Sequence, residues 1–198
     1  MIFGLAKKAA YRLANKGYIP LDDVDLIAYG FFAVLSKFIY GAICVISGFV
    51  FNRFVESIIF YISFLFVRKY AGGFHAKTEL RCFFLSALSI TISVLMISLS
   101  EKVIPVTIVV LCLSMISYIM ISIYAPVPSK ERPLNEEECK RYSNISKIRI
   151  MMLIAISLIT YILEYKNICM SINTAVILSN FLLVAGKRKS KKYSVQNI

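Results

Sequence analysis

Apolar residues in this chain fall into long continuous blocks rather than into the periodic stripes of a soluble protein. Polar and charged residues separate six blocks, at 26–51, 54–67, 83–100, 103–125, 150–165 and 168–186. Four of these blocks have at least the roughly 17 residues that a transmembrane helix requires. The pattern therefore predicts an all-α, polytopic membrane protein with six transmembrane helices in a membrane domain at 26–186.

The second block is the shortest, with 14 residues between Phe54 and Val67. As a helix it would be about 21 Å long, whereas the hydrocarbon core of a bilayer is about 30 Å thick. It would need flanking polar residues, local thinning of the bilayer or burial among other helices. Lys37 and Glu56 are ionisable residues near or within spans, but we favour snorkelling of Lys37 and pairing of Glu56 with Arg53 over a functional role.

Residues 1–25 form a separate amphipathic segment that does not have the continuous apolar region of a signal peptide. On a helical projection, one face is apolar and the other carries Lys7 and Lys8; the apolar face consists of Ile2, Phe3, Leu5, Ala6, Ala9, Ala10 and Leu13. This pattern is typical of a helix that lies in the membrane interface. An amphipathic helix that packs against the protein's own loops is the alternative.

The distribution of charge predicts the orientation of the chain. With 59% apolar and 17% charged residues and a net charge of +12, the chain is more apolar than a soluble domain. Six spans would place 19 Lys and Arg residues on the side of both termini and three on the other. The termini, the loops 68–82 and 126–149 and the basic tail 187–198 should therefore be cytoplasmic. Anionic lipid explains this basic excess, and we expect no nucleic-acid partner.

The segment 68–82 interrupts the apolar pattern and carries the candidate chemistry. It contains the only histidine of the chain, His75, and a cysteine seven positions later, Cys82. A thiol and an imidazole base are the parts that nucleophilic catalysis requires. On a straight helix the two would be about 10.5 Å apart along the axis, too far for proton transfer. Gly72 and Gly73 permit a bend that could bring them together, and an ordinary cytoplasmic loop is the alternative.

The other four cysteines show no pattern of a shared site. Cys44, Cys112 and Cys169 lie in apolar blocks, where a free cysteine behaves as a small hydrophobic residue. Cys139 lies in a charged segment without a second ligand at metal-binding spacing. We therefore expect no disulfide framework, no metal site and no cofactor.

The run 68–76, RKYAGGFHA, with Cys82 in register, resembles the accessory gene regulator protein B (AgrB) family. The sequence Tyr124-Ala125-Pro126, followed by Pro133 after a basic stretch, is similar to that family as well. The resemblance covers nearly the whole chain, because the length, the six apolar blocks, the amphipathic start and the basic tail also agree.

The resemblance implies a membrane-embedded cysteine endopeptidase of bacterial quorum sensing in the cell membrane. Such enzymes cut a small precursor peptide at its C-terminal side on the cytoplasmic face and support cyclisation to a thiolactone or lactone. Carried over by motif position, Cys82 would be the nucleophile and His75 its base. Arg68, Gly72 and Gly73 would be supporting motif residues.

Several points stay open in the sequence. The expected partners are the precursor peptide and the lipid bilayer, and a homodimer is compatible with both. Glu79 shares a helical face with His75 and Cys82, but a solvated interfacial charge is the preferred interpretation of it. A small peptide transporter would require more ionisable residues within the spans than Lys37 and Glu56. A non-enzymatic scaffold that docks a sensor kinase would make the His–Cys pair dispensable.

Overall fold

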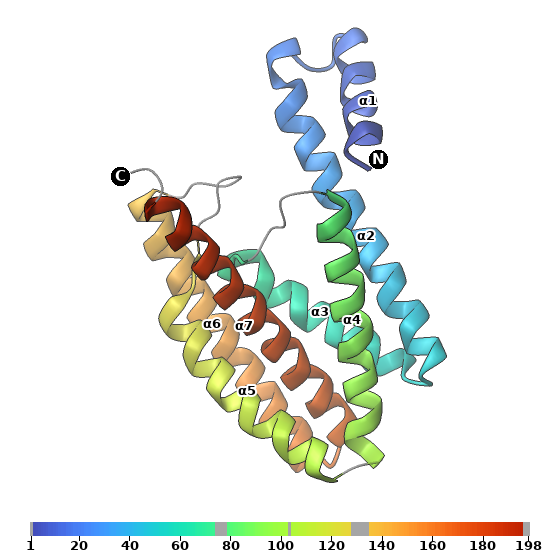
Figure 1. Ribbon diagram of the computed structural model, residues 1–198, viewed down its shortest axis with the longest axis vertical. Coiled ribbons are helices and arrows are strands. Elements are labelled where there is room, and N and C mark those ends of the chain that lie inside the picture. Colours follow the sequence, from blue (N-terminus) through green and yellow to red (C-terminus); the bar gives the residue numbers. More distant parts are fainter. Residues whose placement is uncertain (1, 74–78, 103, 128–134, 196–198) are drawn as a thin grey trace.

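The computed structural model describes residues 2–73, 79–102, 104–127 and 135–195, which form a bundle of helices (Figure 1). The elements in chain order are α1 (Ile2–Asn15), the 3-10 helix η1 (Leu21–Asp23), α2 (Val24–Val50), α3 (Phe54–Ala71), α4 (Glu79–Lys102), α5 (Ile104–Tyr124), α6 (Glu136–Ile162) and α7 (Lys166–Val195). Within these ranges, one isolated bridge between Gly72 and Val127 is the only β-type pairing. The predicted all-α class is confirmed.

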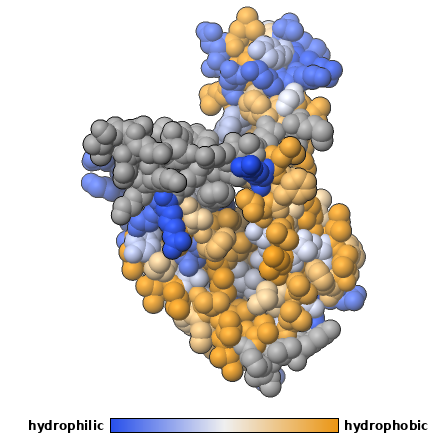
Figure 2. Space-filling view, in the orientation of Figure 1, coloured by the Kyte–Doolittle hydropathy of each residue, from blue (hydrophilic) through white to orange (hydrophobic). Residues whose placement is uncertain are grey.

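Five segments are long and apolar enough to cross a membrane: Leu21–Val50, Leu80–Ser100, Val106–Tyr124, Glu136–Ile162 and Lys166–Arg188. Apolar side chains cover much of the surface over these helices in Figure 2. A soluble monomer rarely exposes such extended apolar patches, because they are costly to hydrate. The chain is therefore a membrane protein.

Helix α3 is the predicted span that does not belong to these five. It is longer than its apolar block, because Arg68 and Lys69 form part of its last turn. Its side chains enter both large hydrophobic clusters, Phe60 with α2, α4 and α7, and Val67 and Ala71 with α5, α6 and α7. Burial among other helices is thus how the short segment is accommodated, and six transmembrane helices remain a prediction.

The crossing of α2 and α3 depends on a glycine. A Cβ atom on Gly48 would lie 2.2 Å from the Oγ atom of Ser57, so a larger residue would force the two helices apart. At the same turn, Arg53 Nη1 lies 3.4 Å from Glu56 Oε1, and the two side chains are 16% and 17% exposed. The predicted pairing of Glu56 with Arg53 is confirmed.

Helices α6 and α7 extend beyond their apolar blocks. α6 begins at Glu136, where the Asn135 side chain accepts a hydrogen bond from the Glu138 N–H at 2.8 Å and the Glu138 carboxylate accepts one from the Asn135 N–H at 3.2 Å. This capping box satisfies two backbone donors and starts the helix within the range that we expected to be a cytoplasmic loop. α7 continues through Val195, past the predicted end at Gly186. Hydropathy detects the apolar part of a helix and not its charged ends.

Helix α1 packs along the N-terminal half of α2, and the hairpin projects beyond the end of α4 (Figure 1). Ala10 is buried in a cluster with residues of α2, and the Phe3 and Phe32 rings are 5.8 Å apart. Lys7 pairs with Asp25 at 2.8 Å, and this hydrogen bond raises the pKa of Lys7. Part of the apolar face thus contacts α2, whereas Leu5 remains 60% exposed. A position of α1 in the membrane interface stays a prediction, as does the alternative of packing on the protein's own loops.

Helices α5, α6 and α7 share a buried polar contact centred on Asn173. Its side-chain oxygen accepts from the Tyr118 hydroxyl at 3.3 Å, and its nitrogen donates to Ser157 Oγ at 3.0 Å and to the Cys169 carbonyl at 2.8 Å. Interhelical hydrogen bonds of this kind hold transmembrane helices together where hydrophobic driving force is absent.

Candidate functional site

Cys82 lies in the first turn of α4, which begins at Glu79, and is partly exposed. The first N–H groups of a helix have no intrahelical partners, and the helix dipole is positive at this end. His75, the second member of the predicted pair, lies outside the described residues, as does the side chain of Glu79.

Tyr40 of α2 reaches the same turn of α4. Its ring centroid is 6.1 Å from that of Phe83, the residue that follows Cys82. Sequence reasoning missed Tyr40, since it is one of several aromatic residues in the first apolar block. The residues next to Tyr40 in the sequence do not distinguish it from an aromatic side chain that faces the lipid.

Arg68 lies at the C-terminal end of α3, just beyond its apolar part, and is partly buried. Its Nη1 atom donates to the carbonyl of Gly72 at 2.8 Å. Burial lowers the pKa of Arg68 to about 10, and the negative charge of a Cys82 thiolate acts in the opposite direction. The guanidinium is therefore protonated near neutral pH and interacts electrostatically with the candidate nucleophile.

The two glycines of the motif adopt backbone conformations that other residues rarely adopt. Gly72 has a φ of +73° and Gly73 a φ of +143°. A Cβ atom on Gly72 would lie 2.3 Å from the Val127 carbonyl oxygen, and one on Gly73 would lie 1.6 Å from Arg68 Nη1. Both positions require glycine, for conformation as well as for space.

Distant segments bind two carbonyl groups near the end of α3, of which that of Ala71 has no partner within the helix. The Val127 N–H donates to the Ala71 carbonyl at 3.0 Å. Arg149 of α6 donates to the Phe66 carbonyl at 2.7 Å, and its guanidinium lies 4.2 Å from the centroid of the Tyr70 ring. The start of the segment 68–82 is thus held by α6 and by the residues that follow α5. Sequence reasoning counted Arg149 only as a charge that orients the chain.

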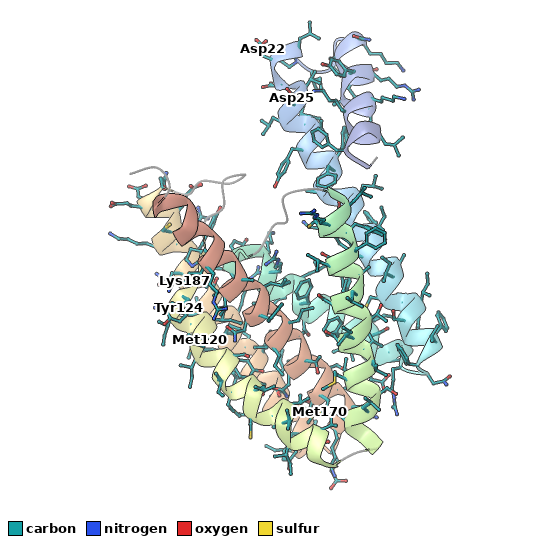
Figure 3. All side chains as sticks on the ribbon, in the orientation of Figure 1. Asp22, Asp25, Met120, Tyr124, Met170 and Lys187 are labelled. Carbon is teal, nitrogen blue, oxygen red and sulfur yellow. The ribbon has the colours of Figure 1, made fainter. Side chains whose placement is uncertain are left out.

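The segment that carries Val127 is itself tied to α7. The ammonium group of Lys187 lies 3.3 Å from the centroid of the Tyr124 ring at the end of α5 (Figure 3). The resemblance had singled out Tyr124, Ala125 and Pro126, and these residues lead directly to the contact with Gly72. These residues therefore help to position the start of the segment 68–82.

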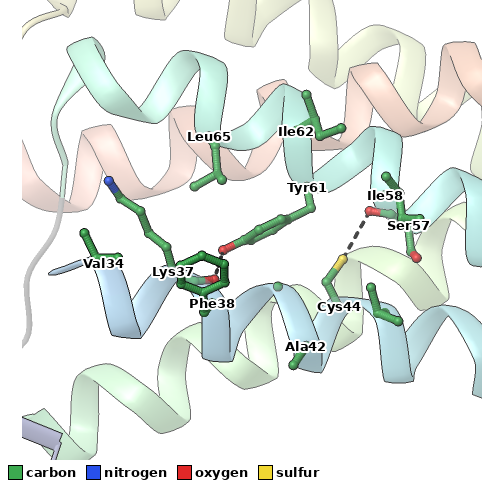
Figure 4. Close-up of a pocket in the computed structure, with 12 residues that line it drawn as sticks. Val34, Lys37, Phe38, Ala42, Cys44, Ser57, Ile58, Tyr61, Ile62 and Leu65 are labelled. Carbon is green, nitrogen blue, oxygen red and sulfur yellow. Dashed lines mark hydrogen bonds between the residues drawn. The ribbon is translucent and has the colours of Figure 1, made fainter. Parts of the chain in front are cut away.

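A separate groove of about 450 Å³ lies between α2 and α3 (Figure 4). Apolar side chains form most of its lining, with Lys37 toward one end and Cys44 and Ser57 toward the other. The Tyr61 hydroxyl donates to the Lys37 carbonyl across it. Cys82 does not line this groove, so the groove is not the candidate site.

Comparison with known proteins agrees with the resemblance. The family model for accessory gene regulator B matches residues 6–183. The chain belongs to the accessory gene regulator B family. An AgrB-like protein of Clostridium perfringens is 27% identical over 189 residues, which cover 93% of this chain and 88% of that protein. The accessory gene regulator protein B of Staphylococcus aureus is 28% identical over 109 residues, 54% of this chain and 56% of that protein. No solved structure matches the chain.

The matched range includes every residue of the predicted site. Of these, the structure places Arg68 and the two glycines in direct contact at the end of α3, and Cys82 in the first turn of α4. The contact between His75 and Cys82 remains a prediction.

Proposed function

We propose that this protein is a membrane-embedded cysteine endopeptidase that matures a quorum-sensing peptide. It cleaves a small precursor at its C-terminal side on the cytoplasmic face of the bacterial cell membrane and supports cyclisation to a thiolactone or lactone. The observation that carries this proposal is the position of Cys82 in the first turn of α4, at the positive end of the helix dipole. Membership of the accessory gene regulator B family supports it.

The proposed reaction has two acyl transfers. His75 accepts the thiol proton of Cys82, and the sulfur attacks the carbonyl carbon of the scissile peptide bond. The C–N bond breaks, His75 returns the proton to the leaving amine, and the C-terminal fragment departs. The remaining peptide is then joined to Cys82 as a thioester.

Cyclisation uses the same acyl group. A thiol of the substrate attacks the thioester carbonyl, the new ring closes, and the Cys82 sulfur leaves and regains a proton. One thioester replaces another, so little bond energy is lost. Water would hydrolyse the intermediate irreversibly, so a site at the membrane, where water is scarce, suits the reaction.

The proposed reaction requires positive charge near the Cys82 sulfur. An ordinary thiol is only a few per cent thiolate at pH 7, so the thiolate must be stabilised. The positive end of the α4 dipole and the guanidinium of Arg68 both act on Cys82. A protonated His75 would supply a third positive charge.

The decisive experiment replaces Cys82. We expect Cys82→Ala to insert normally and to cleave no precursor, and Cys82→Ser to be nearly inactive, because a hydroxyl is far less acidic than a thiol. The substrate is a synthetic precursor with an amphipathic leader, a central cysteine and an acidic tail. Acid-quenched wild type should carry a hydroxylamine-labile substrate fragment that Cys82→Ala does not carry.

Cys112→Ala is the matched control, because this cysteine is exposed on α5. It should cleave the precursor at the wild-type rate. His75→Ala should lose most of the activity. Cleavage by purified Cys82→Ala would contradict the proposed function and favour a transporter or a scaffold.

A further inference from the structure

We propose that the groove between α2 and α3 binds one acyl chain of an anionic phospholipid, whose phosphate group pairs with Lys37. Cys82 does not line this groove, so the site is independent of the proposed function. Lys37 comes from the middle of the first apolar block, where we expected its side chain to snorkel toward the membrane surface. The groove gives that side chain a specific ligand.

The groove has about the length of one membrane leaflet. Its lining residues on α2 begin at Val34 and end at Val45, a rise of about 16.5 Å at 1.5 Å per residue. Half of the hydrocarbon core of a bilayer is about 15 Å thick. Three of the lining side chains, those of Val34, Phe38 and Ile62, are largely exposed. The groove is therefore open along its side, and an extended acyl chain can enter it from the bilayer.

The groove also has the polarity of a lipid, with its charged end toward the C-terminus of α3. On α3 the lining runs from Ser57 to Leu65, and Leu65 is about one helical turn before Arg68. The ammonium group of Lys37 points toward that end, away from Cys44 and Ser57 (Figure 4). A headgroup at Lys37 with its chain directed toward Ser57 would belong to the leaflet nearest to the candidate site.

The polar groups at the other end of the groove are satisfied within the protein. The Cys44 thiol donates to the Ser57 carbonyl at 3.2 Å, and the Ser57 hydroxyl donates to the Phe54 carbonyl at 2.8 Å. The Tyr61 hydroxyl donates to the backbone carbonyl of Lys37. In the part of the chain that the structure describes, no carboxylate pairs with the Lys37 ammonium group. The groove therefore offers an occupant apolar walls and one positive charge.

The acidic residues nearest to Lys37 in the sequence on either side, Asp25 and Glu56, have other partners. Asp25 is about 18 Å away along the axis of α2 and pairs with Lys7 at 2.8 Å. Glu56 follows Val55 near the far end of the groove and pairs with Arg53. A lysine without a carboxylate favours a ligand with a net negative charge. Phosphatidylglycerol has this charge, whereas phosphatidylcholine carries its own cation beside the phosphate.

A peptide helix fits this groove less well than an acyl chain. A helix about 10 Å across occupies roughly 850 Å³ over two turns, whereas the groove has a volume of about 450 Å³. A helix could insert only single side chains, and an extended peptide would leave backbone polar groups unsatisfied against the apolar walls. An acyl chain has no such groups and can lie in the groove along its length.

The test uses two photoactivatable phospholipids with a diazirine near the end of one acyl chain, one with a phosphatidylglycerol and one with a phosphatidylcholine headgroup. The full-length protein is reconstituted in vesicles of equal parts of phosphatidylcholine and phosphatidylglycerol that contain one probe as a tracer. Mass spectrometry of proteolytic fragments gives the ratio of phosphatidylglycerol to phosphatidylcholine labelling at each position. We expect a ratio about fivefold higher at Ala42, Val45 and Ile58 in the groove than at Ile116 and Ile119, which are exposed on α5.

Variants of the groove separate the charge from the apolar walls. Lys37→Gln should lower the headgroup ratio in the groove about fivefold, because one contact between a lysine and an anionic lipid is lost. Lys37→Arg should keep the ratio of the parent protein. Lys8→Gln is the matched control, because Lys8 is an exposed lysine of α1 that does not line the groove. Ala42→Phe should reduce labelling of Ile58 by both probes, because the larger side chain occupies the groove.

Three results would overturn the proposal. Equal headgroup ratios in the groove and on α5 would mean that the groove holds only bulk lipid. An unchanged ratio in Lys37→Gln would mean that the ammonium group does not bind the headgroup. The synthetic precursor should leave the labelling of the groove unchanged. If it instead abolishes labelling by both probes, the groove binds the substrate and not a lipid.

Discussion

At the scale of single residues, Gly73 is the position where the structure leaves least room for a side chain. It is buried, it has a φ of +143°, and a Cβ atom would overlap Arg68 Nη1 at 1.6 Å. Gly73→Ala should displace the guanidinium that interacts with Cys82 and add backbone strain on the order of 1–3 kcal/mol. We expect precursor cleavage to fall at least tenfold while the protein remains in the membrane, as measured by cleavage rate per reconstituted protein.

Gly17 offers a matched control for that experiment. It also has a positive φ, +77°, but no atom lies within 4 Å of a Cβ built there. Gly17→Ala should have a similar conformational cost of about 1 kcal/mol in stability and little effect on cleavage. Equal losses of activity in both variants would mean that strain, and not the displacement of Arg68, causes the defect.

At the scale of elements, the contact between α6 and the end of α3 is a second support of the site. Arg149 donates to the Phe66 carbonyl at 2.7 Å and lies over the Phe66 and Tyr70 rings at 4.3 and 4.2 Å. Arg149→Gln should leave that carbonyl without its charged donor and remove the cation–π contacts, at a cost of about 2 kcal/mol. We expect cleavage to fall about tenfold, with faster amide hydrogen exchange in the last turn of α3.

Arg141→Gln is the control for that prediction. Arg141 is an exposed residue of α6, so its replacement removes the same charge without touching α3. It should retain the exchange pattern of wild type. If both variants lose activity equally, the charge of α6 matters and the contact with α3 does not.

The same elements show how far the sequence could predict the structure. Apolar length is a local property, so it located the centres of α2 and of α4 to α7. The charged ends of α6 and α7 look like loop and tail in a hydropathy pattern, although a capping box starts α6 at Glu136. At the site, the motif identified Arg68 and Cys82 because they are close in sequence. Tyr40 and Arg149 belong to other helices, and only tertiary packing brings them to the motif.

At the scale of the whole molecule, the course of α3 decides which side of the membrane the site faces. α3 starts beside Gly48 at the far end of α2 and ends beside Val127, which follows α5. It therefore runs from the end of α2 to the end of α5, although its composition is not that of a typical span. If α3 crosses, the chain has six crossings and both termini lie on one side. If it does not, five crossings place the N-terminus opposite the tail.

Labelling with an impermeant maleimide distinguishes these arrangements in intact cells and inverted vesicles. Single cysteines are introduced at three exposed positions, Tyr18, Lys140 and Lys166, in a protein that lacks its native cysteines. Because 19 basic residues fall on one side with six crossings, Tyr18→Cys and Lys140→Cys should react only from the cytoplasmic side. Lys166→Cys, between α6 and α7, should react only from outside. Reaction of Tyr18→Cys and Lys140→Cys from opposite sides would mean that α3 does not cross, and the motif 68–82 would then lie on the side opposite the N-terminus.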